Sequence, residues 1–175
     1  MNNDCLALKK RSITHVVSVV SADQQRRMPP WIQSAKLVQC SDNETADLGR
    51  HFSDVCAFID AARRMGGNVY VHCGAGISRA PTVVTAFLMR SASLRLREAF
   101  AIVKRHRPSA RPNKGFIKQL QAWEATLGLS PDVNTTSGAR LPSPPTDQTL
   151  AGRSTSALTL GSTTGLPVAA PRRAS

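Results

Sequence analysis

Three short apolar runs alternate with longer segments in which apolar residues recur every three or four positions. The runs lie at residues 13–20, 35–40 and 68–71, and their valine, isoleucine, leucine and tyrosine side chains favour a buried strand. Residues 28–31, Met-Pro-Pro-Trp, separate the first two runs, and proline cannot occupy the interior of a helix or of a central strand. The pattern therefore predicts three buried strands, with a loop after the first.

Four longer segments show the apolar stripe of an amphipathic helix. They cover residues 47–65, 80–89, 93–106 and 116–127. Glycine or proline follows three of them, at Gly66, Pro108 and Gly128, and Ser93 is the predicted N-cap of the third helix. Strands that alternate with helices predict an α/β layer fold with a mostly parallel sheet.

Composition changes towards the C-terminus. Residues 130–175 hold no aromatic side chain, and Ser, Thr, Pro, Gly and Ala dominate them without an apolar period. Such a segment cannot bury enough surface to offset an ordering cost of roughly 1 to 2 kcal/mol per residue. The sequence therefore predicts one folded domain at 1–129 and a disordered tail at 130–175.

No apolar run approaches the length of about 20 residues that spans a bilayer, and the first residues lack the apolar core of a signal peptide. We expect a soluble protein of the cytoplasm or the nucleus. Cys5, Cys40, Cys56 and Cys73 show no paired spacing, so neither a zinc site nor a disulfide framework is predicted, and we expect no metal and no cofactor. The first three cysteines are interpreted as small, partly buried side chains, with the alternative that one of them resolves an oxidised Cys73.

The net charge of +12 is compatible with nucleic acid, an acidic membrane surface or phosphorylated proteins as partners. The tail contributes four arginines and two aspartates, which leaves +10 for the first 129 residues. Because the chain has one tyrosine and scattered aromatic residues, it offers no stacking platform, and nucleic-acid binding is not expected.

The octapeptide at residues 72–79, His-Cys-Gly-Ala-Gly-Ile-Ser-Arg, carries the chemistry. It lies between a predicted strand and a predicted helix, where loop amides and the positive end of the helix dipole favour an anion. Its cysteine supplies a nucleophile, its small residues let the backbone curl round an anion, and its arginine offers a planar fork for phosphate oxygens. The sequence therefore predicts a phosphate-binding loop with a nucleophile at its floor.

With these residues the chain resembles the dual-specificity phosphatases, a branch of the cysteine-based protein tyrosine phosphatases, from about Cys5 to Leu127. Six motifs in one order carry the resemblance: residues 13–16, Asp42 ahead of Leu48 and Phe52, residues 58–60, residues 71–82, residues 86–89, and Arg107-Pro108 with Pro112-Asn113, Phe116 and Gln119-Leu120. The family implies a central mixed sheet wrapped by helices and a two-step, metal-free hydrolysis of phosphomonoesters. It usually carries a further strand and turn before the segment that begins here at Cys5, so we expect a sheet edge or core face to be uncovered.

The resemblance also implies the roles of individual residues. Cys73 would attack phosphorus, Arg79 would hold the equatorial oxygens, and Asp42, 31 residues upstream, would protonate the leaving oxygen and later take a proton from water. Ser78 would steady the departing thiolate, and His72 would orient Cys73. Phosphate would bind within the loop formed by Gly74, Ala75, Gly76, Ile77, Ser78 and Arg79.

Alternatives remain for several of these residues. Asp42 could be a turn former beside Asn43, and Asp47 is interpreted as a helix cap. His72 could be a hydrogen-bonded core group. Asn113 would brace the phosphate loop in the family, although Pro-Asn is also a common helix entry.

A basic stretch follows the third predicted helix, at Lys104, Arg105, Arg107, Arg111, Lys114 and Lys118. It is predicted to attract acidic or multiply phosphorylated substrates, with a solvated cationic face as the alternative. The predicted function is hydrolysis of phosphotyrosine and of phosphoserine or phosphothreonine in proteins, through a cysteinyl-phosphate intermediate. Alternatives are a phosphatase for inositol lipids or RNA 5′ ends, which uses the same loop, and a catalytically weak phosphate-binding module.

Overall fold

The computed structural model describes residues 3–24, 28–129 and 158–160. In chain order, its elements are α1 (Asn3–Lys10), β1 (Ile13–Val20), a 3₁₀ turn (Ala22–Gln24), β2 (Ser34–Gln39), a second 3₁₀ turn (Gly49–His51), α2 (Phe52–Arg64), β3 (Asn68–His72), α3 (Arg79–Ala92), α4 (Leu96–His106), α5 (Lys114–Thr126) and β4 (Leu158–Leu160). The three predicted strands and four predicted helices are all present. Among the described residues, no helix combines the length and apolar character needed to cross a membrane.

The strands form one sheet in the order β2-β1-β3-β4, and the three pairs are parallel. β1 is central, with Val17 paired to Lys36 of β2 on one side and to Val71 of β3 on the other. Seven of its eight residues are buried, as its run of β-branched side chains requires. The predicted α/β class with a parallel sheet flanked by helices is confirmed, and no antiparallel pair occurs among the described strands.

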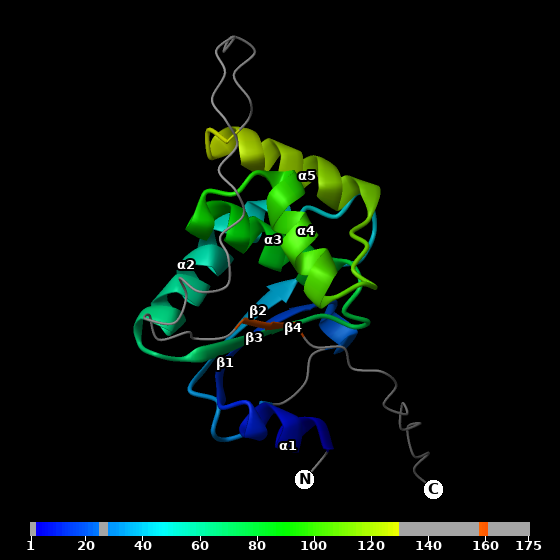
Figure 1. The fold of residues 1–175 in the computed structure, drawn as a ribbon. Coiled ribbons are helices and arrows are strands. Elements are labelled where there is room, and N and C mark those ends of the chain that lie inside the picture. The colour runs from blue at the N-terminus through cyan, green and yellow to red at the C-terminus, as the bar shows by residue number, and fades with distance from the viewer. Residues whose placement is uncertain (1–2, 25–27, 130–157, 161–175) are drawn as a thin grey trace, which may run out of the picture.

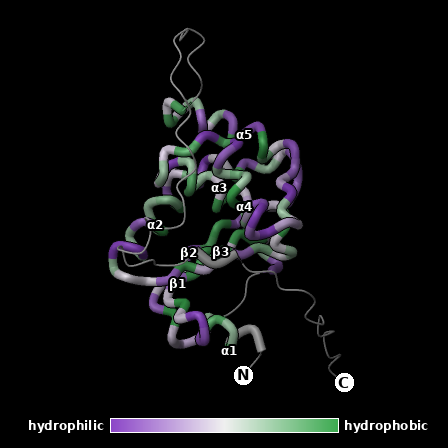
Figure 2. The backbone as a smooth tube through the Cα atoms, in the orientation of Figure 1, coloured by the Kyte–Doolittle hydropathy of each residue, from purple (hydrophilic) through white to green (hydrophobic). Residues whose placement is uncertain are grey.

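Helices α2 to α5 gather on one side of the sheet, and α1 lies beyond β1 on the side away from α5 (Figure 1). The core lies between this helical layer and the sheet, and its largest fully buried side chains include Phe52 of α2, Phe87 of α3 and Phe116 of α5. Figure 2 shows hydrophobic residues concentrated along the strands and along the inward sides of the helices. α3 is the most deeply buried helix, because it packs against α2, α4, α5 and the sheet.

The prediction that Ser93 is the N-cap of α4 is wrong. Ser93 ends α3 in the left-handed region, with φ at 51°, because the chain needs residues 93–95 to reverse from α3 into α4. Arg95 is the N-cap, and carboxylates satisfy the first amides of the helix. Glu98 accepts from the Arg95 amide at 3.0 Å, and Glu124 accepts from the Leu96 amide at 2.6 Å.

Three further details differ from the sequence pattern. The helix predicted at 47–65 is split, because the 3₁₀ turn precedes α2, and Asp47 caps that turn by accepting from the Arg50 amide at 3.1 Å. The apolar pattern does not predict α1. Within the tail predicted to be disordered, residues 158–160 form β4, which covers the edge of β3. The rest of residues 130–175 and the side chain of Cys5 lie outside the described part of the chain.

Candidate active site

The predicted phosphate loop connects β3 to the first residue of α3. Val69 and Val71 of β3 are fully buried, and the strand ends at His72, directly before Cys73, which is 2% exposed. Gly76 adopts a positive φ of 67°, which favours glycine in the tight turn. The loop therefore brings Cys73 to the carboxyl end of the sheet and leads into the N-terminus of a 14-residue helix.

Contacts from the segment after α4 fix the outer side of the loop. Arg107 donates from Nε to the Gly76 carbonyl at 3.3 Å and from Nη2 to the Ala75 carbonyl at 3.4 Å. The Arg111 amide donates to the Ile77 carbonyl at 2.6 Å. Because these three carbonyls point outward, the positive ends of their peptide dipoles point towards the concave side of the loop, as an anion-binding loop requires.

Arg79 is buried, and its side-chain nitrogens face the segments that follow β1 and β2. Nη1 donates to the Cys40 carbonyl after β2 at 3.0 Å, and Nη2 donates to Oε1 of Gln24 after β1 at 3.3 Å. Nε has no hydrogen-bond partner within the described residues, and it lies 3.7 Å from Oδ2 of Asp42, beyond hydrogen-bonding distance. A Cβ on Gly74 would lie 3.2 Å from Nη2, so glycine at this position lets the guanidinium lie against the loop.

Asp42 lies at the same site, on the loop after β2. Its Oδ1 accepts from the Ser78 hydroxyl at 2.7 Å and from Nδ2 of Asn113 at 3.1 Å. The Asp42 side chain is 34% exposed, whereas that of Arg79 is 7% exposed. The structure thus brings together four of the predicted site residues, from the loop after β2, the phosphate loop, α3 and the entry to α5.

Asn113 makes the contacts that both alternatives left open by the sequence require, at the entry to α5 and at the phosphate loop. As the N-cap of α5, its Oδ1 accepts from the Phe116 amide at 2.9 Å. Its Nδ2 also donates to the Asn43 carbonyl at 3.2 Å, and its own amide donates to the Ser78 hydroxyl at 3.2 Å. Asn113 therefore links the helix, the Asp42 loop and the phosphate loop.

A second polar residue of α5 holds the same loop further along. Oε1 of Gln119 accepts from the amides of Leu48 at 2.9 Å and Gly49 at 2.6 Å, and its Nε2 donates to the Ala46 carbonyl at 2.8 Å. The sequence pattern assigns no supporting role at the site to Gln119, Gln24 or Arg107. The position of Gln24 soon after β1, at the carboxyl edge of a parallel sheet, is the feature of the sequence that could have indicated its role at the site.

His72 is held within the sheet. Its Nε2 lies 2.8 Å from the Ser18 hydroxyl of β1, and its ring stacks on Tyr70 with centroids 5.3 Å apart. These contacts fix the residue that immediately precedes Cys73. They are compatible with the predicted orienting role, which stays a prediction.

The other described cysteines are Cys40, whose carbonyl accepts from Arg79, and Cys56 of α2. Cys40 and Cys56 are free and buried. Burial raises the pKa of the Cys40 thiol and raises the pKa of Cys56 to about 11, so both stay protonated at neutral pH. The described part of the chain holds no cluster of three or more acidic, histidine or cysteine side chains that could bind a metal ion.

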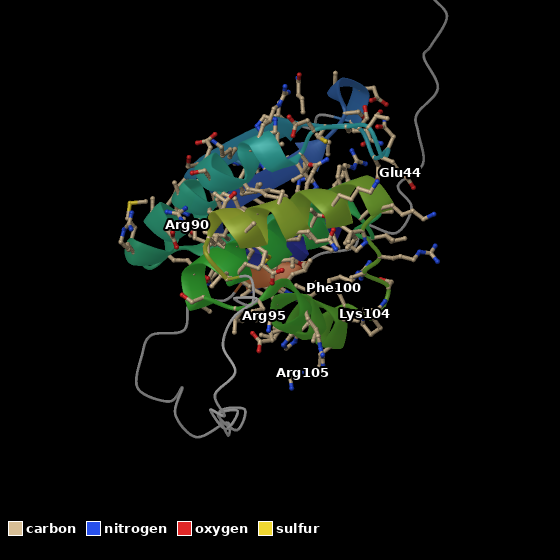
Figure 3. The ribbon with its side chains drawn as sticks, turned by 90° about the horizontal axis from the view of Figure 1, so that it is seen from above. Glu44, Arg90, Arg95, Phe100, Lys104 and Arg105 are labelled. Atoms are coloured by element: carbon tan, nitrogen blue, oxygen red, sulfur yellow. The ribbon has the colours of Figure 1, made fainter. Side chains whose placement is uncertain are left out.

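The predicted basic stretch divides into two groups. Lys104 donates to the Pro108 carbonyl at 2.7 Å and to the Ala110 carbonyl at 2.8 Å, so it stabilises the loop after α4, as Arg107 stabilises the phosphate loop. The remaining residues are exposed: Arg105, Arg111, Lys114 and Lys118. Figure 3 shows Arg105 on the outer side of α4, directed away from α5. Arg111 lies two residues before Asn113, and Lys114 directly follows it.

Comparison with known proteins places this site in a family. Residues 2–126 match the family model "Dual specificity phosphatase, catalytic domain". The chain belongs to the dual specificity phosphatase family. Dual specificity protein phosphatase 1 of Arabidopsis thaliana is 39% identical over 123 residues, which cover 70% of this chain and 61% of that protein.

Two human members of the family show the same likeness. Dual specificity protein phosphatase 5 of Homo sapiens is 45% identical over 92 residues, which cover 53% of this chain but only 24% of that protein. The crystal structure of human DUSP28 superimposes with a TM-score of 0.67 at 37% identity and covers 70% of this chain and 82% of that one. The chain thus spans about three fifths of the plant phosphatase and about a quarter of human phosphatase 5.

Proposed function

We propose that this domain hydrolyses phosphate monoesters on tyrosine and on serine or threonine side chains of proteins. One observation carries the proposal. The buried Arg79 guanidinium keeps an Nε donor without a hydrogen-bond partner among the described residues, beside a loop that holds Cys73 and 3.7 Å from the Asp42 carboxylate. A buried charged donor is costly to leave unsatisfied, and a phosphate oxygen supplies the acceptor it lacks.

In the first step, the Cys73 sulfur attacks phosphorus, so that an S–P bond forms while the P–O bond to the substrate oxygen breaks. Asp42, protonated in the productive state, donates its proton to the leaving oxygen. Arg79, the loop amides and the N-terminus of α3 stabilise the charge on the equatorial oxygens. The products are a dephosphorylated hydroxyl and a cysteinyl-phosphate.

In the second step, water attacks phosphorus and the S–P bond breaks, which releases inorganic phosphate and the Cys73 thiolate. Asp42, now a carboxylate, accepts the proton of that water and returns to its starting state. The Ser78 hydroxyl, which donates to Asp42 in this structure, turns towards the departing sulfur and stabilises it. The protein needs no cofactor for either step, because nucleophile, acid and anion-binding groups come from the chain.

The proposal of protein substrates rests on the family and on the character of the loop. Residues 74–77 carry no charge, whereas lysines or other polar groups within the loop would favour an inositol lipid or an RNA 5′ end. A phosphotyrosine peptide, a phosphothreonine peptide, a phosphoinositide and a triphosphate-ended RNA should therefore be compared as substrates. Faster turnover of the lipid or the RNA than of both peptides would favour the alternative phosphatase.

The mechanism is tested by hydrolysis of an aryl phosphate as a function of pH. We expect Cys73→Ser to abolish turnover, and Asp42→Asn to lower kcat by about 10² to 10⁴-fold and to flatten the basic limb of the pH profile. The matched controls are Cys56→Ser and Asp47→Asn. Cys56 is a buried thiol of α2, and Asp47 caps a turn on the loop that carries Asp42, a role asparagine can also fill.

Retention of turnover by Cys73→Ser would overturn the covalent mechanism. An equal loss in Asp42→Asn and Asp47→Asn would show that the loop, rather than a proton donor, is what the Asp42 substitution disturbs. A wild-type protein that binds phosphopeptide without turnover would identify the chain as a phosphate-binding module.

A further inference from the structure

A strand from the far C-terminus lies beside the strand that delivers the nucleophile. β4 pairs in parallel with β3, with Leu158 opposite Val69, Thr159 opposite Tyr70 and Leu160 opposite Val71. Figure 1 shows this short strand against β3, on the side of the sheet order away from β1. The paired stretch of β3 ends two residues before Cys73.

β3 needs a partner at this edge for a physical reason. Its other edge is hydrogen-bonded to β1, and Val69 and Val71 are fully buried. Without β4, the amides and carbonyls that face away from β1 would form an exposed row beside a buried apolar strand. Such an edge is a template for an added strand, and the backbone bonds gained there supply the binding energy.

The sequence of the tail indicates why residues 158–160 occupy this edge. The tail contains five leucines, at positions 141, 150, 158, 160 and 166, and only Leu158 and Leu160 are two residues apart. The order Leu-Thr-Leu has the period of two that is typical of a strand, and Gly161 follows it directly.

The segment between α5 and β4 is also long enough for the tail of the same chain to reach the edge of β3. A parallel pair needs a crossover of a dozen or more residues, and 28 residues separate Leu129 from Leu158. Fully extended, 28 residues span roughly 90 Å, several times the radius of a domain of this size. The tail of the same chain can therefore reach the edge of β3 without a second copy of the protein.

We propose that the β3 edge is a strand-docking site whose occupant is residues 158–160 of the same chain. Docking holds β3 between two parallel neighbours, with Ser18 of β1 bonded to His72 on one side and β4 on the other. The strand that fixes the position of Cys73 is thereby stabilised by a segment outside the predicted domain. Release of the tail loosens β3 and the start of the phosphate loop, which makes the tail a modulator of the site.

The test uses the full chain and measures amide hydrogen exchange. Thr159→Pro removes one donor and restricts the backbone in the middle of β4, and Thr149→Pro is the matched control in the tail but outside β4. We expect exchange of the amides of residues 69–72 to rise at least about tenfold in Thr159→Pro only. Exchange at Ile59 in α2 should stay unchanged in both variants, which shows that the domain is folded.

Rescue in trans provides a second measurement. A synthetic peptide of residues 155–163 should restore protection of residues 69–72 in Thr159→Pro, and the same peptide with proline at position 159 should not. Equal protection in the two proline variants would overturn the proposal. Wild-type protection that depends on protein concentration, together with a dimer on sizing, would assign the docked strand to a second copy and would overturn the assignment to the chain's own tail.

Activity separates this proposal from the proposed function. If both hold, Thr159→Pro should hydrolyse an aryl phosphate several-fold more slowly than Thr149→Pro, and the rescuing peptide should restore the rate. A wild-type chain without turnover would refute the proposed function, and the exchange experiment would still decide whether β4 docks on β3.

Discussion

Gly115 in the first turn of α5 packs against the backbone of the loop that carries Asp42. It is buried, and a Cβ at this position would lie 2.6 Å from the carbonyl carbon of Glu44 and 2.7 Å from its Cα. These are backbone atoms, so no rotation of a side chain relieves the overlap. Figure 3 shows Glu44 beside the beginning of α5.

The size of the displacement follows from these distances. Ordinary contact begins at 3.4 Å, and the Glu44 carbonyl oxygen lies closer to the added Cβ than the carbonyl carbon does, so in Gly115→Ala the Glu44 backbone must retreat by at least about 0.8 Å. Asp42 lies two residues before Glu44, and a shift of this size stretches the 2.7 Å bond from Ser78 to Asp42 towards the limit of a hydrogen bond. Because a misplacement of about 1 Å can cost 10²-fold in rate, we expect kcat to fall by about 10- to 100-fold.

The assay is aryl phosphate hydrolysis between pH 5 and 8, together with binding of vanadate as a phosphate mimic. Vanadate affinity should change less than about threefold, because the atoms nearest to the added Cβ belong to Glu44 rather than to Arg79 or the phosphate loop. The matched control is Gly128→Ala. Gly128 has a φ of 67°, and a Cβ added there would meet no heavy atom within 4 Å, so alanine costs about 1 to 2 kcal/mol of stability without touching the Asp42 loop.

We expect both variants to have a lower Tm and only Gly115→Ala to have a lower kcat. A folded Gly115→Ala protein with wild-type kcat would refute the argument that α5 sets the position of the acid. An equal loss of kcat in Gly128→Ala would attribute the effect to general destabilisation.

Three further predictions concern the supports and surroundings of the site. Arg107→Ala should lower kcat/KM by about 5- to 30-fold, because it removes two hydrogen bonds to the carbonyls of the phosphate loop. Arg105 is an exposed cation two residues earlier, and Arg105→Ala should change kcat/KM less than twofold in the same kinetic assay. Arg111→Glu combined with Lys114→Glu should lower kcat/KM for an acidic phosphopeptide and flatten the dependence of kcat/KM on salt. The same double variant should have a small effect on hydrolysis of a neutral aryl phosphate. Unchanged kcat/KM for the peptide at both low and high salt would reject the proposal of acidic substrates. The pKa of the Cys56 thiol is about 11 in the folded protein against an ordinary 9.0, so the unfolded chain loses this proton first as pH rises. Between pH 9 and 11, the free energy of unfolding of the wild type should therefore fall by up to about 2 to 3 kcal/mol more than that of Cys56→Ala. Urea unfolding at each pH measures this difference.

Local patterns made the strands and the phosphate loop predictable. The first strand is a run of β-branched residues at 13–20, and the structure begins and ends β1 at the same residues. The loop at 73–78 is a contiguous motif, so the residues that support its chemistry are neighbours in the sequence. Pro112 and Asn113 likewise indicate the start of α5, which begins at Lys114.

Features that depend on a distant partner were not predictable in this way. Gln24 and Gln119 are polar residues of the kind that is usually solvent-exposed, and their roles exist only where Arg79 and the backbone at 46–49 come close to them. β4 has three residues in a segment rich in serine and threonine, which is too short a pattern to predict a strand without its pairing partner, the edge of β3.

The strand order explains why Asp42, the proposed acid, needs support from a helix. Parallel strands place Gln24, Asp42 and Cys73 after β1, β2 and β3 at the same edge of the sheet, but β1 lies between β2 and β3. The Asp42 loop must therefore cross the end of β1, a distance of about two strand spacings or roughly 10 Å, to reach Ser78 and Arg79.

No strand pairs with the loop along that crossing within the described part of the chain, and α5 supports the loop through Asn113 at its N-cap and Gln119 further along. The proposed nucleophile is held differently, because Cys73 follows directly from a strand paired on both sides. It follows that substitutions on the inner side of α5 should act on proton transfer, while substitutions along β3 and β4 should act on the nucleophile and the binding of phosphate.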